Sequence, residues 1–394
     1  MEKMYLIKIG EIALKAGNRK IFEQQLKRNI LKRFSKDAGY FGNNGRYFLT
    51  VNGYTDGEIK EKLATVFGIT GFVPVKRTNK DMDTIGREAA ELTTKVLASH
   101  PEKKTFKIEP RRSDKGFPLN SYEIACRLGD HLLKSFPFLT VDCNNPDFTI
   151  HCEVREKAVL YVDPHTGPGG LPVGCAGKGT LLLSGGIDSP AAAYLMAKRG
   201  LKLDAVYFHT PPFTSDKAEE KVISLARQLA PYCSGLRLFT VPFTPVQLHI
   251  KQNCNEEETT LLMRACMMKI SEIIGGNNGS KCLVTGEALS QVASQTVESL
   301  TFTGSATVFP VFRPLIGYDK EEIILTARMI GTFDISIQPY DDCCTVFSPK
   351  RPIVKPAFNK IQHAYEKLEI ENLLQEAAEN AQCIYLPPNG NVAG

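Results

Sequence analysis

The chain has 394 residues, 43% of them apolar and 23% charged, and its formal net charge at pH 7 is +5. This length suits two or three domains, and the composition is that of a globular protein, which excludes a largely disordered chain. Because no apolar stretch is long enough to cross a membrane and no secretion signal is evident, we expect a cytoplasmic protein without a membrane segment.

The first predicted unit begins with a strand at residues 4–10 and a helix at residues 18–34. In this helix apolar side chains recur every four residues, and the opposite face carries basic residues from Arg19 to Arg33, for which we expect simple solvent exposure. A strand at residues 46–51 and a short helix at residues 56–68 follow. These elements fit a small α+β module.

The second predicted unit contains a helix, a strand, a helix and two further strands. Their expected ranges are residues 83–100, 104–110, 121–136, 148–156 and 158–163. The loop after the first strand holds Arg111, Arg112, Lys115 and Phe117. Cations beside an aromatic ring suit RNA, whose phosphates they neutralise and whose bases the ring stacks on. A loop held by its own salt bridges is the alternative.

Charge also separates the N-terminal part of the chain from the rest. Residues 1–180 contain 29 Lys and Arg against 21 Asp and Glu, whereas the remaining residues contain 19 against 22. This asymmetry favours a polyanion as the partner of the N-terminal part, with a solvated basic surface as the alternative.

A Gly- and Pro-rich stretch at residues 165–179 predicts a linker. Beyond it, apolar strands alternate with helices, which predicts an α/β fold with a doubly wound parallel sheet. The 11 cysteines show neither CxxC pairs nor zinc-finger spacing, which argues against a structural zinc site and a disulfide framework.

The stretch L-L-L-S-G-G-I-D-S-P, residues 181–190, connects the first predicted strand of this sheet to the helix that follows it. Its glycines allow backbone amides to turn toward an anion, Ser184 and Ser189 add hydroxyl donors, and Pro190 starts a helix whose positive end faces the same point. We therefore predict a phosphate-binding loop rather than an incidental turn. It matches neither the Walker A pattern nor G-x-G-x-x-G.

The S-G-G-x-D-S sequence resembles the pyrophosphate loop of the PP-loop ATPases. Residues 284–296, 313–323 and 339–352 further resemble the tRNA uracil 4-sulfurtransferase (ThiI) family, and residues 10–26, 111–124 and 167–174 resemble its N-terminal half. The resemblance implies a ferredoxin-like domain at residues 1–60, a THUMP domain at residues 61–170 and a PP-loop domain at residues 175–394. It also implies a short family member without a rhodanese domain.

The family's reaction, as the resemblance implies, uses ATP and Mg²⁺ to adenylate uridine 8 of tRNA and then replaces the adenylate with sulfur. The sulfur comes as a persulfide from a cysteine desulfurase, and the same relay can reach a sulfur carrier protein of thiamine synthesis. Two alternatives remain: another PP-loop tRNA-modifying ligase or thiolase, and a THUMP RNA-binding protein without catalysis. A homodimer also remains open.

The resemblance assigns roles to individual residues. Asp188, Lys320 and Cys344 are the expected catalytic residues, Asp188 also as a magnesium ligand and Cys343 as a partner thiol that resolves the persulfide. Arg111, Arg112 and Lys115 are the expected RNA contacts. The expected ATP contacts are Leu182, Leu183, Ser184, Gly185, Gly186, Ser189, Tyr207, Phe208, Arg264, Gly286 and Gln295. One departure from the family pattern is Ser290, which stands where a glycine is usual.

Overall fold

The computed structural model describes residues 2–34, 37–43, 46–340, 349 and 351–389. The chain forms two compact units. The first unit comprises residues 1–13, 34–64 and 69–169, and the second comprises residues 14–33, 65–68 and 170–394. In the part of the chain that the structure describes, no helix is both long and apolar enough to cross a membrane.

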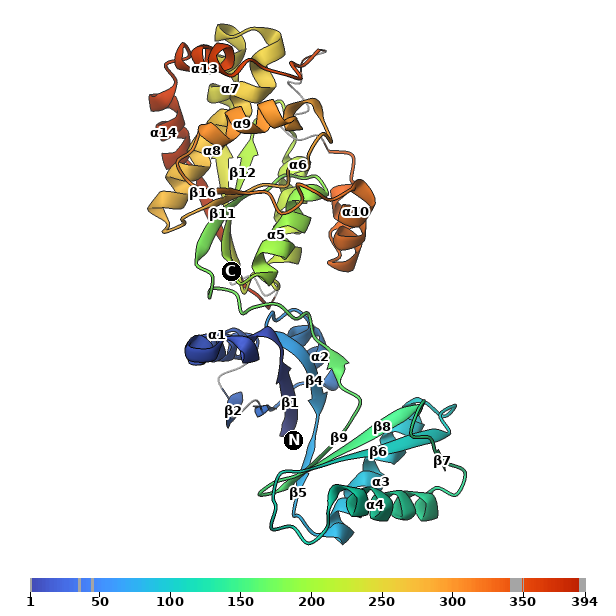
Figure 1. The fold of residues 1–394 in the computed structure, drawn as a ribbon. Helices are drawn as coiled ribbons and strands as arrows, with labels where there is room; N and C mark the ends of the chain where they lie inside the picture. Colours follow the sequence, from blue (N-terminus) through green and yellow to red (C-terminus); the bar gives the residue numbers. More distant parts are fainter. Residues whose placement is uncertain (1, 35–36, 44–45, 341–348, 350, 390–394) are drawn as a thin grey trace. The chain divides into compact units, whose positions relative to one another are not determined.

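The first unit contains two five-stranded sheets (Figure 1). The antiparallel sheet nearest the N-terminus has the order β10-β4-β1-β3-β2. Its strands are β1 (Lys3–Ile9), β2 (Gly39–Asn43), β3 (Arg46–Val51), β4 (Ile69–Pro74) and β10 (His165–Thr166), with α2 at Asp56–Ala64. Because β4 pairs with β1, this sheet continues beyond residue 60, where the sequence suggested a boundary.

The second sheet of this unit has the order β5-β9-β8-β6-β7 and is mixed, since β6 runs parallel to β8 and β8 antiparallel to β9. Two helices pack their apolar faces on it through a core that includes Phe106, Leu128 and Phe148. The elements are β5 (Lys76–Thr78), α3 (Met82–Ser99), β6 (Thr105–Arg112), α4 (Ser121–Ser135), β7 (Thr140–Val141), β8 (Phe148–Val154) and β9 (Ala158–Val162).

A buried carboxylate joins the two sheets of the first unit. Glu153 of β8, with only 6% of its side chain exposed, pairs with Arg46 of β3 at 2.9 Å. The hydroxyl of Tyr161 donates a hydrogen bond of 3.1 Å to the same carboxylate. Burial alone would raise the pKa of Glu153, but the hydrogen bond and charge of Arg46 outweigh it and hold that pKa below its ordinary value.

The second unit is built on a six-stranded sheet of order β15-β14-β11-β12-β13-β16, in which only β16 runs antiparallel to its neighbour among the described strands. The predicted doubly wound parallel sheet is therefore confirmed. The strands are β11 (Lys178–Leu182), β12 (Lys202–His209), β13 (Leu236–Pro242), β14 (Leu283–Val284), β15 (Val311–Phe312) and β16 (Gln382–Leu386).

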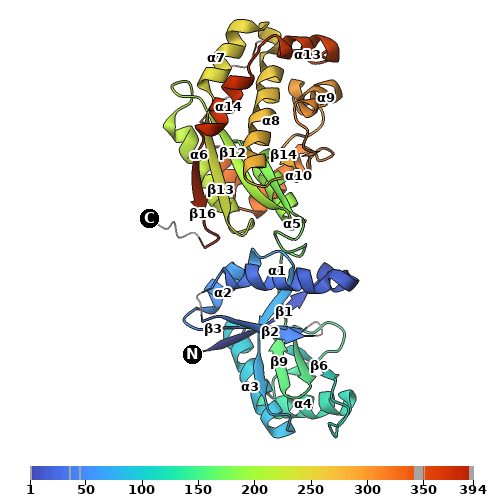
Figure 2. The ribbon, with the colours of Figure 1, turned by 90° about the vertical axis from the view of Figure 1, so that its left-hand side faces the viewer.

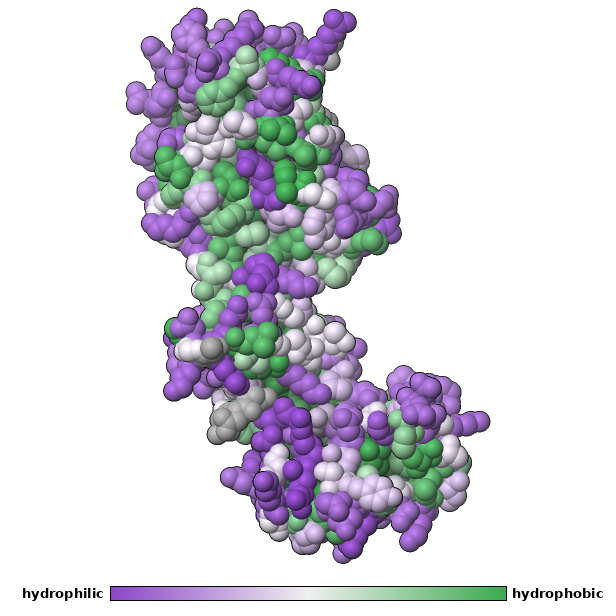
Figure 3. Space-filling model, viewed as in Figure 1, coloured by the Kyte–Doolittle hydropathy of each residue, from purple (hydrophilic) through white to green (hydrophobic). Residues whose placement is uncertain are grey.

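Helices cover both faces of this sheet (Figures 1 and 2). One core packs against α5 and α6 and includes Ala192 and Val222, and the other packs against α7, α8 and α14 and includes Val246, Leu262 and Leu374. The helices of the unit are α5 (Asp188–Lys198), α6 (Asp216–Leu229), α7 (Thr244–Asn253), α8 (Thr259–Asn277), α9 (Val297–Ser305), α10 (Lys320–Met329), α11 (Phe333–Ser336), α13 (Phe358–Glu366) and α14 (Glu371–Glu379). Figure 3 shows hydrophilic surface with scattered hydrophobic groups over these elements.

Helix α1 (Arg19–Leu31) belongs to the second unit although it lies early in the chain. The amide of Asn29 donates to the carbonyl oxygen of Val173 at 3.0 Å. Arg33, just beyond the helix, is 2% exposed and donates to the carbonyl oxygens of Pro231 and Pro388. The expectation that Arg33 lies on a solvated face is therefore wrong, because its guanidinium satisfies carbonyl groups that distant parts of the chain bring to it.

Candidate active site

A cavity of about 240 Å³ opens where β11, β12 and β14 end. This is the edge of a parallel sheet at which ligands of doubly wound proteins bind. The residues that line it are Leu182, Leu183, Ser184, Asp188, Ser189, Tyr207, Phe208, Arg264, Met267, Met268, Thr285, Gly286, Glu287 and Gln295. The cavity thus gathers most of the residues predicted as ATP contacts, whereas Gly185 and Gly186 lie in the same loop but do not line it.

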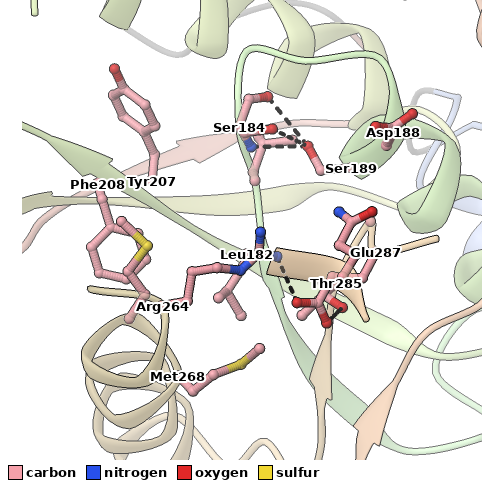
Figure 4. A pocket seen from close by; sticks show the side chains of 14 residues that line it. Leu182, Ser184, Asp188, Ser189, Tyr207, Phe208, Arg264, Met268, Thr285 and Glu287 are labelled. Carbon is pink, nitrogen blue, oxygen red and sulfur yellow. Dashed lines mark hydrogen bonds and ion pairs between the residues drawn. The ribbon is translucent and has the colours of Figure 1, made fainter. Parts of the chain in front are cut away.

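The loop from β11 to α5 folds back on its own hydroxyl groups (Figure 4). The Ser184 amide donates to Oγ of Ser189 at 2.9 Å, and the two serine hydroxyls lie 3.1 Å apart. Helix α5 begins at Asp188, two residues before the predicted start at Pro190. Its free amides and positive dipole end point into the loop, an arrangement that binds anions such as phosphate.

Gly286 presses against the start of α5. A Cβ atom at this position would lie 2.6 Å from the amide nitrogen of Ser189 and 2.7 Å from the carbonyl carbon of Asp188. Side chains do not tolerate such distances to backbone atoms, so only glycine fits here. Gly286, which the resemblance names as an ATP contact, therefore packs directly against the anion-binding loop.

Asp188, which lines the cavity, is held by two side chains that do not line it. Its Oδ1 accepts a hydrogen bond of 2.6 Å from Nζ of Lys320, the first residue of α10. Its Oδ2 accepts one of 2.9 Å from the amide of Gln291. The preceding residue, Ser290, adopts a φ of 60°, a left-handed conformation that costs a non-glycine residue free energy. The resemblance named both Asp188 and Lys320 as catalytic residues but gave no role to Gln291, although Gln291 lies in one of the matching motifs.

A buried carboxylate organises the opposite wall of the cavity. Glu287, 1% exposed, accepts from Arg264 at 2.6 Å, from Arg313 at 2.7 Å and from the hydroxyl of Thr285 at 2.9 Å. In Figure 4 a dashed line joins the side chains of Arg264 and Glu287. Burial would raise the pKa of Glu287, yet the charges of Arg264 and Arg313 hold it below its ordinary value. Glu287 and Arg313 were not among the predicted site residues.

Aromatic and amide side chains also line the cavity. Phe208 packs in the core beside α7 and α8, whereas Tyr207, on the other side of β12, packs in the core beside α5 and α6. Gln295, in the short 3-10 turn Ala293–Gln295, is 6% exposed, and its Oε1 has no hydrogen-bond partner within the described residues. A buried acceptor of this kind requires a donor from a ligand or water.

The predicted RNA contacts lie at the end of β6 and in the loop that follows. Arg111 and Lys115 are exposed, but Arg112 donates to the carbonyl oxygens of Phe117 and Leu119 at 3.2 and 3.4 Å. Phe117 is 7% exposed and belongs to the core of the first unit. Base stacking on Phe117 is therefore wrong, and Arg112 holds its own loop.

Cys343 and Cys344 lie outside the described residues. Over the placed ranges of the chain, no group of three or more His, Cys, Asp or Glu side chains could hold a metal ion. Asp188, with 22% of its side chain exposed, nevertheless fits Mg²⁺ that arrives with ATP, because such ions take one or two protein carboxylates and complete their shell with phosphate oxygens and water.

The sheet, the anion-binding loop and the mixed polar and apolar cavity define a nucleotide-binding α/β domain. Comparison with known proteins identifies the family. The model of the family described as thiamine biosynthesis protein (ThiI) matches residues 174–370, that of the THUMP domain matches residues 79–163, and that of the ThiI ferredoxin-like domain matches residues 4–73. The chain belongs to the ThiI family, as the resemblance predicted.

Curated relatives match over almost their whole length. The chain is 46% identical over 381 residues to a probable tRNA sulfurtransferase of Thermoanaerobacter pseudethanolicus, covering 96% of this chain and 99% of the relative. It is 43% identical over 388 residues to a probable tRNA sulfurtransferase of Acetivibrio thermocellus, covering 98% and 99%. Among solved structures, a 4-thiouridine synthetase in complex with RNA and ATP matches with a TM-score of 0.92 and 35% identity over 98% of this chain and all of that one. A Pyrococcus horikoshii protein matches with a TM-score of 0.66 and 26% identity over 84% and 99%.

Proposed function

We propose that the protein is an ATP-dependent tRNA 4-thiouridine synthetase that releases AMP and pyrophosphate. The observation that carries this proposal is the cavity, whose lining combines an anion-binding loop, the guanidinium of Arg264 and the unpartnered amide oxygen of Gln295 with apolar side chains. The relatives named tRNA sulfurtransferase and the structure of a synthetase with RNA and ATP support it.

In the first half-reaction the cavity binds ATP. We assign the adenine ring to the apolar side chains of the lining, and its amino group to the unpartnered Oε1 of Gln295, which can accept a hydrogen bond. The phosphates then lie at the loop of residues 184–189, whose amides and hydroxyls neutralise the leaving diphosphate. The uridine oxygen attacks the α-phosphate, and Lys320, already beside Asp188, stabilises the negative charge that develops.

Asp188 is the residue that would hold Mg²⁺, and this ion would supply charge neutralisation of the phosphate oxygens. Before that, Asp188, which lines the cavity, keeps the amine of Lys320 beside it through their 2.6 Å contact. The carboxylate of Asp188 therefore has two roles. It holds Lys320 near the phosphates before Mg²⁺ binds, and it then binds Mg²⁺ instead of the lysine.

In the second half-reaction we assign sulfur transfer to Cys344. The terminal sulfur of a persulfide on Cys344 attacks C4 of the adenylated uridine, the C–O bond breaks and AMP leaves. The new bond joins sulfur to C4, and the S–S bond inherited from the persulfide then links Cys344 to the uridine. A second thiol, for which Cys343 is adjacent in sequence, attacks the sulfur of Cys344, so that 4-thiouridine leaves and a disulfide forms that a thiol reductant reopens. A cysteine desulfurase in the cytoplasm supplies the persulfide, and a sulfur carrier protein of thiamine synthesis is a second acceptor.

The two half-reactions give the experiment that tests this function. Pyrophosphate release is measured with and without tRNA, and 4-thiouridine is measured by mass spectrometry of tRNA nucleosides. Asp188→Ala should abolish pyrophosphate release and retain tRNA binding. Cys344→Ser should release pyrophosphate and form no 4-thiouridine. Cys343→Ser, which changes the neighbouring thiol, is measured in the same two assays for comparison. Pyrophosphate release that ignores tRNA, or wild-type turnover by Asp188→Ala, would contradict the proposal.

A further inference from the structure

Arg313 stands directly behind the cavity without lining it. Its Nε lies 2.7 Å from Oε2 of Glu287, while Nη2 of Arg264 lies 2.6 Å from Oε1 of the same carboxylate. Arg264 lines the cavity and Arg313 does not. The carboxylate therefore bridges one arginine that can touch a ligand and one that cannot.

The charges of this cluster explain why two arginines are needed. Glu287 is buried and its pKa is held below the ordinary value, so it carries a negative charge at neutral pH. With one arginine, the pair would be neutral and the guanidinium of Arg264 would be fully engaged by Glu287. With Arg313 present, the cluster has one net positive charge, and it faces the cavity through Arg264.

The cluster also fixes the direction of Arg264. Its Nη1 donates to the hydroxyl of Ser294 at 3.0 Å while its Nη2 is held by Glu287, so the planar guanidinium has a defined orientation. Arg313 is anchored in turn by the carbonyl oxygen of Leu300, at 3.4 Å from its Nη2. The sequence assigned no role to Arg313 itself, although Lys320 in the same motif was an expected catalytic residue.

We propose that Arg313 is a positioning residue for the nucleotide: by neutralising Glu287 it leaves the charge of Arg264 available to the phosphates or ribose of ATP. The inference rests on the proposed function, since it requires that ATP occupies this cavity. If it is right, loss of Arg313 raises the KM for ATP and leaves the rate of adenylation at saturating ATP close to that of the wild type.

A purely structural role for Arg313 is the competing explanation, and the same domain contains a matched control. Asp204 of β12 is 2% exposed and is also bridged by two cations, Lys178 at 2.8 Å and Arg237 at 2.5 Å. Asp204 lies near the start of β12, whereas the cavity lies near its end. Arg237→Gln therefore removes one of two cations from a buried carboxylate of the same unit, away from the cavity.

The test measures ATP binding to the full-length protein by isothermal titration calorimetry, together with its thermal midpoint. Arg313→Gln should weaken ATP binding by about tenfold, and Arg313→Lys, which keeps the charge but loses the guanidinium geometry, should weaken it less. Arg237→Gln should lower the thermal midpoint and leave ATP affinity unchanged. In an Arg264→Gln background, Arg313→Gln should have less than about a twofold further effect, because Arg313 acts through Arg264.

Three outcomes would overturn the inference: ATP affinity unchanged in a folded Arg313→Gln variant, equal losses of affinity in Arg313→Gln and Arg237→Gln, or additive losses in the Arg264 background. Failure of the wild-type protein to bind ATP would instead remove the proposed function, and this inference with it. The KM and the maximal rate of tRNA-dependent pyrophosphate release give an independent readout, in which only the KM should change.

Discussion

Replacement of Gly286 by alanine should displace the loop that we assign to the phosphates. The new Cβ would lie 2.6 Å from the Ser189 amide nitrogen, whereas ordinary contacts begin at 3.4 Å, so the start of α5 must move by about 0.8 Å. Such overpacking against backbone costs about 1–3 kcal/mol of stability. A shift of this size along the 2.9 Å bond from Ser184 to Ser189 would stretch it to about 3.7 Å, beyond hydrogen-bond range.

The assay pairs thermal unfolding with ATP binding by calorimetry. Gly286→Ala should lower the thermal midpoint and weaken ATP binding by about tenfold or more, because a loss of about 1.4 kcal/mol corresponds to a factor of ten. Gly276→Ala in α8 is the matched control, since the nearest atom to its new Cβ is Cζ of Phe309 at 3.9 Å. If Gly286→Ala binds ATP with wild-type affinity, the close packing of this residue on the loop does not govern the site.

Three further predictions concern other parts of the structure. Ser290→Gly should raise the free energy of unfolding by up to about 1 kcal/mol in chemical denaturation, because it relieves the left-handed backbone at φ 60°; a loss of stability would contradict this. Glu153 has a lowered pKa in the folded state, so its stabilising effect is complete above its ordinary pKa of 4.5 and is lost as the pH falls below it. The difference in thermal midpoint between the wild type and Glu153→Gln should therefore shrink from pH 7 to pH 3, and a constant difference would exclude the effect. Charge reversal at the exposed residues Arg111 and Lys115 should weaken tRNA binding and flatten its salt dependence, and an unchanged slope would place the RNA elsewhere.

Local sequence was sufficient for the parts of the structure that depend on neighbours in the chain. The S-G-G-x-D-S loop follows a strand and precedes a helix as predicted, because glycine and proline constrain the backbone locally. The alternation of apolar strands and helices likewise predicted the parallel sheet. The order of the strands and the pairing of β4 with β1 depend on contacts between distant segments, which periodicity does not record.

The misses have the same physical origin. Glu287 reads as an ordinary polar residue until Arg264 and Arg313, from two other segments, surround it. Arg33 follows a helix face full of charges, yet its guanidinium is buried among carbonyl groups near residues 231 and 388. Phe117 looks like an exposed aromatic among cations, but the loop turns it into the core. In each case tertiary contacts determine whether the side chain is buried and which groups it contacts, and the residue type alone does not.

The placement of α1 in the second unit has a consequence for protein engineering. A fragment that starts at residue 170 would lack Asn29 and Arg33, leaving the carbonyl oxygens of Val173, Pro231 and Pro388 without these donors. Chimaeras that exchange the catalytic half between relatives therefore need to carry residues 14–33 and 65–68 with it. These two separate segments of the N-terminal region therefore have to be exchanged together with the nucleotide-binding unit.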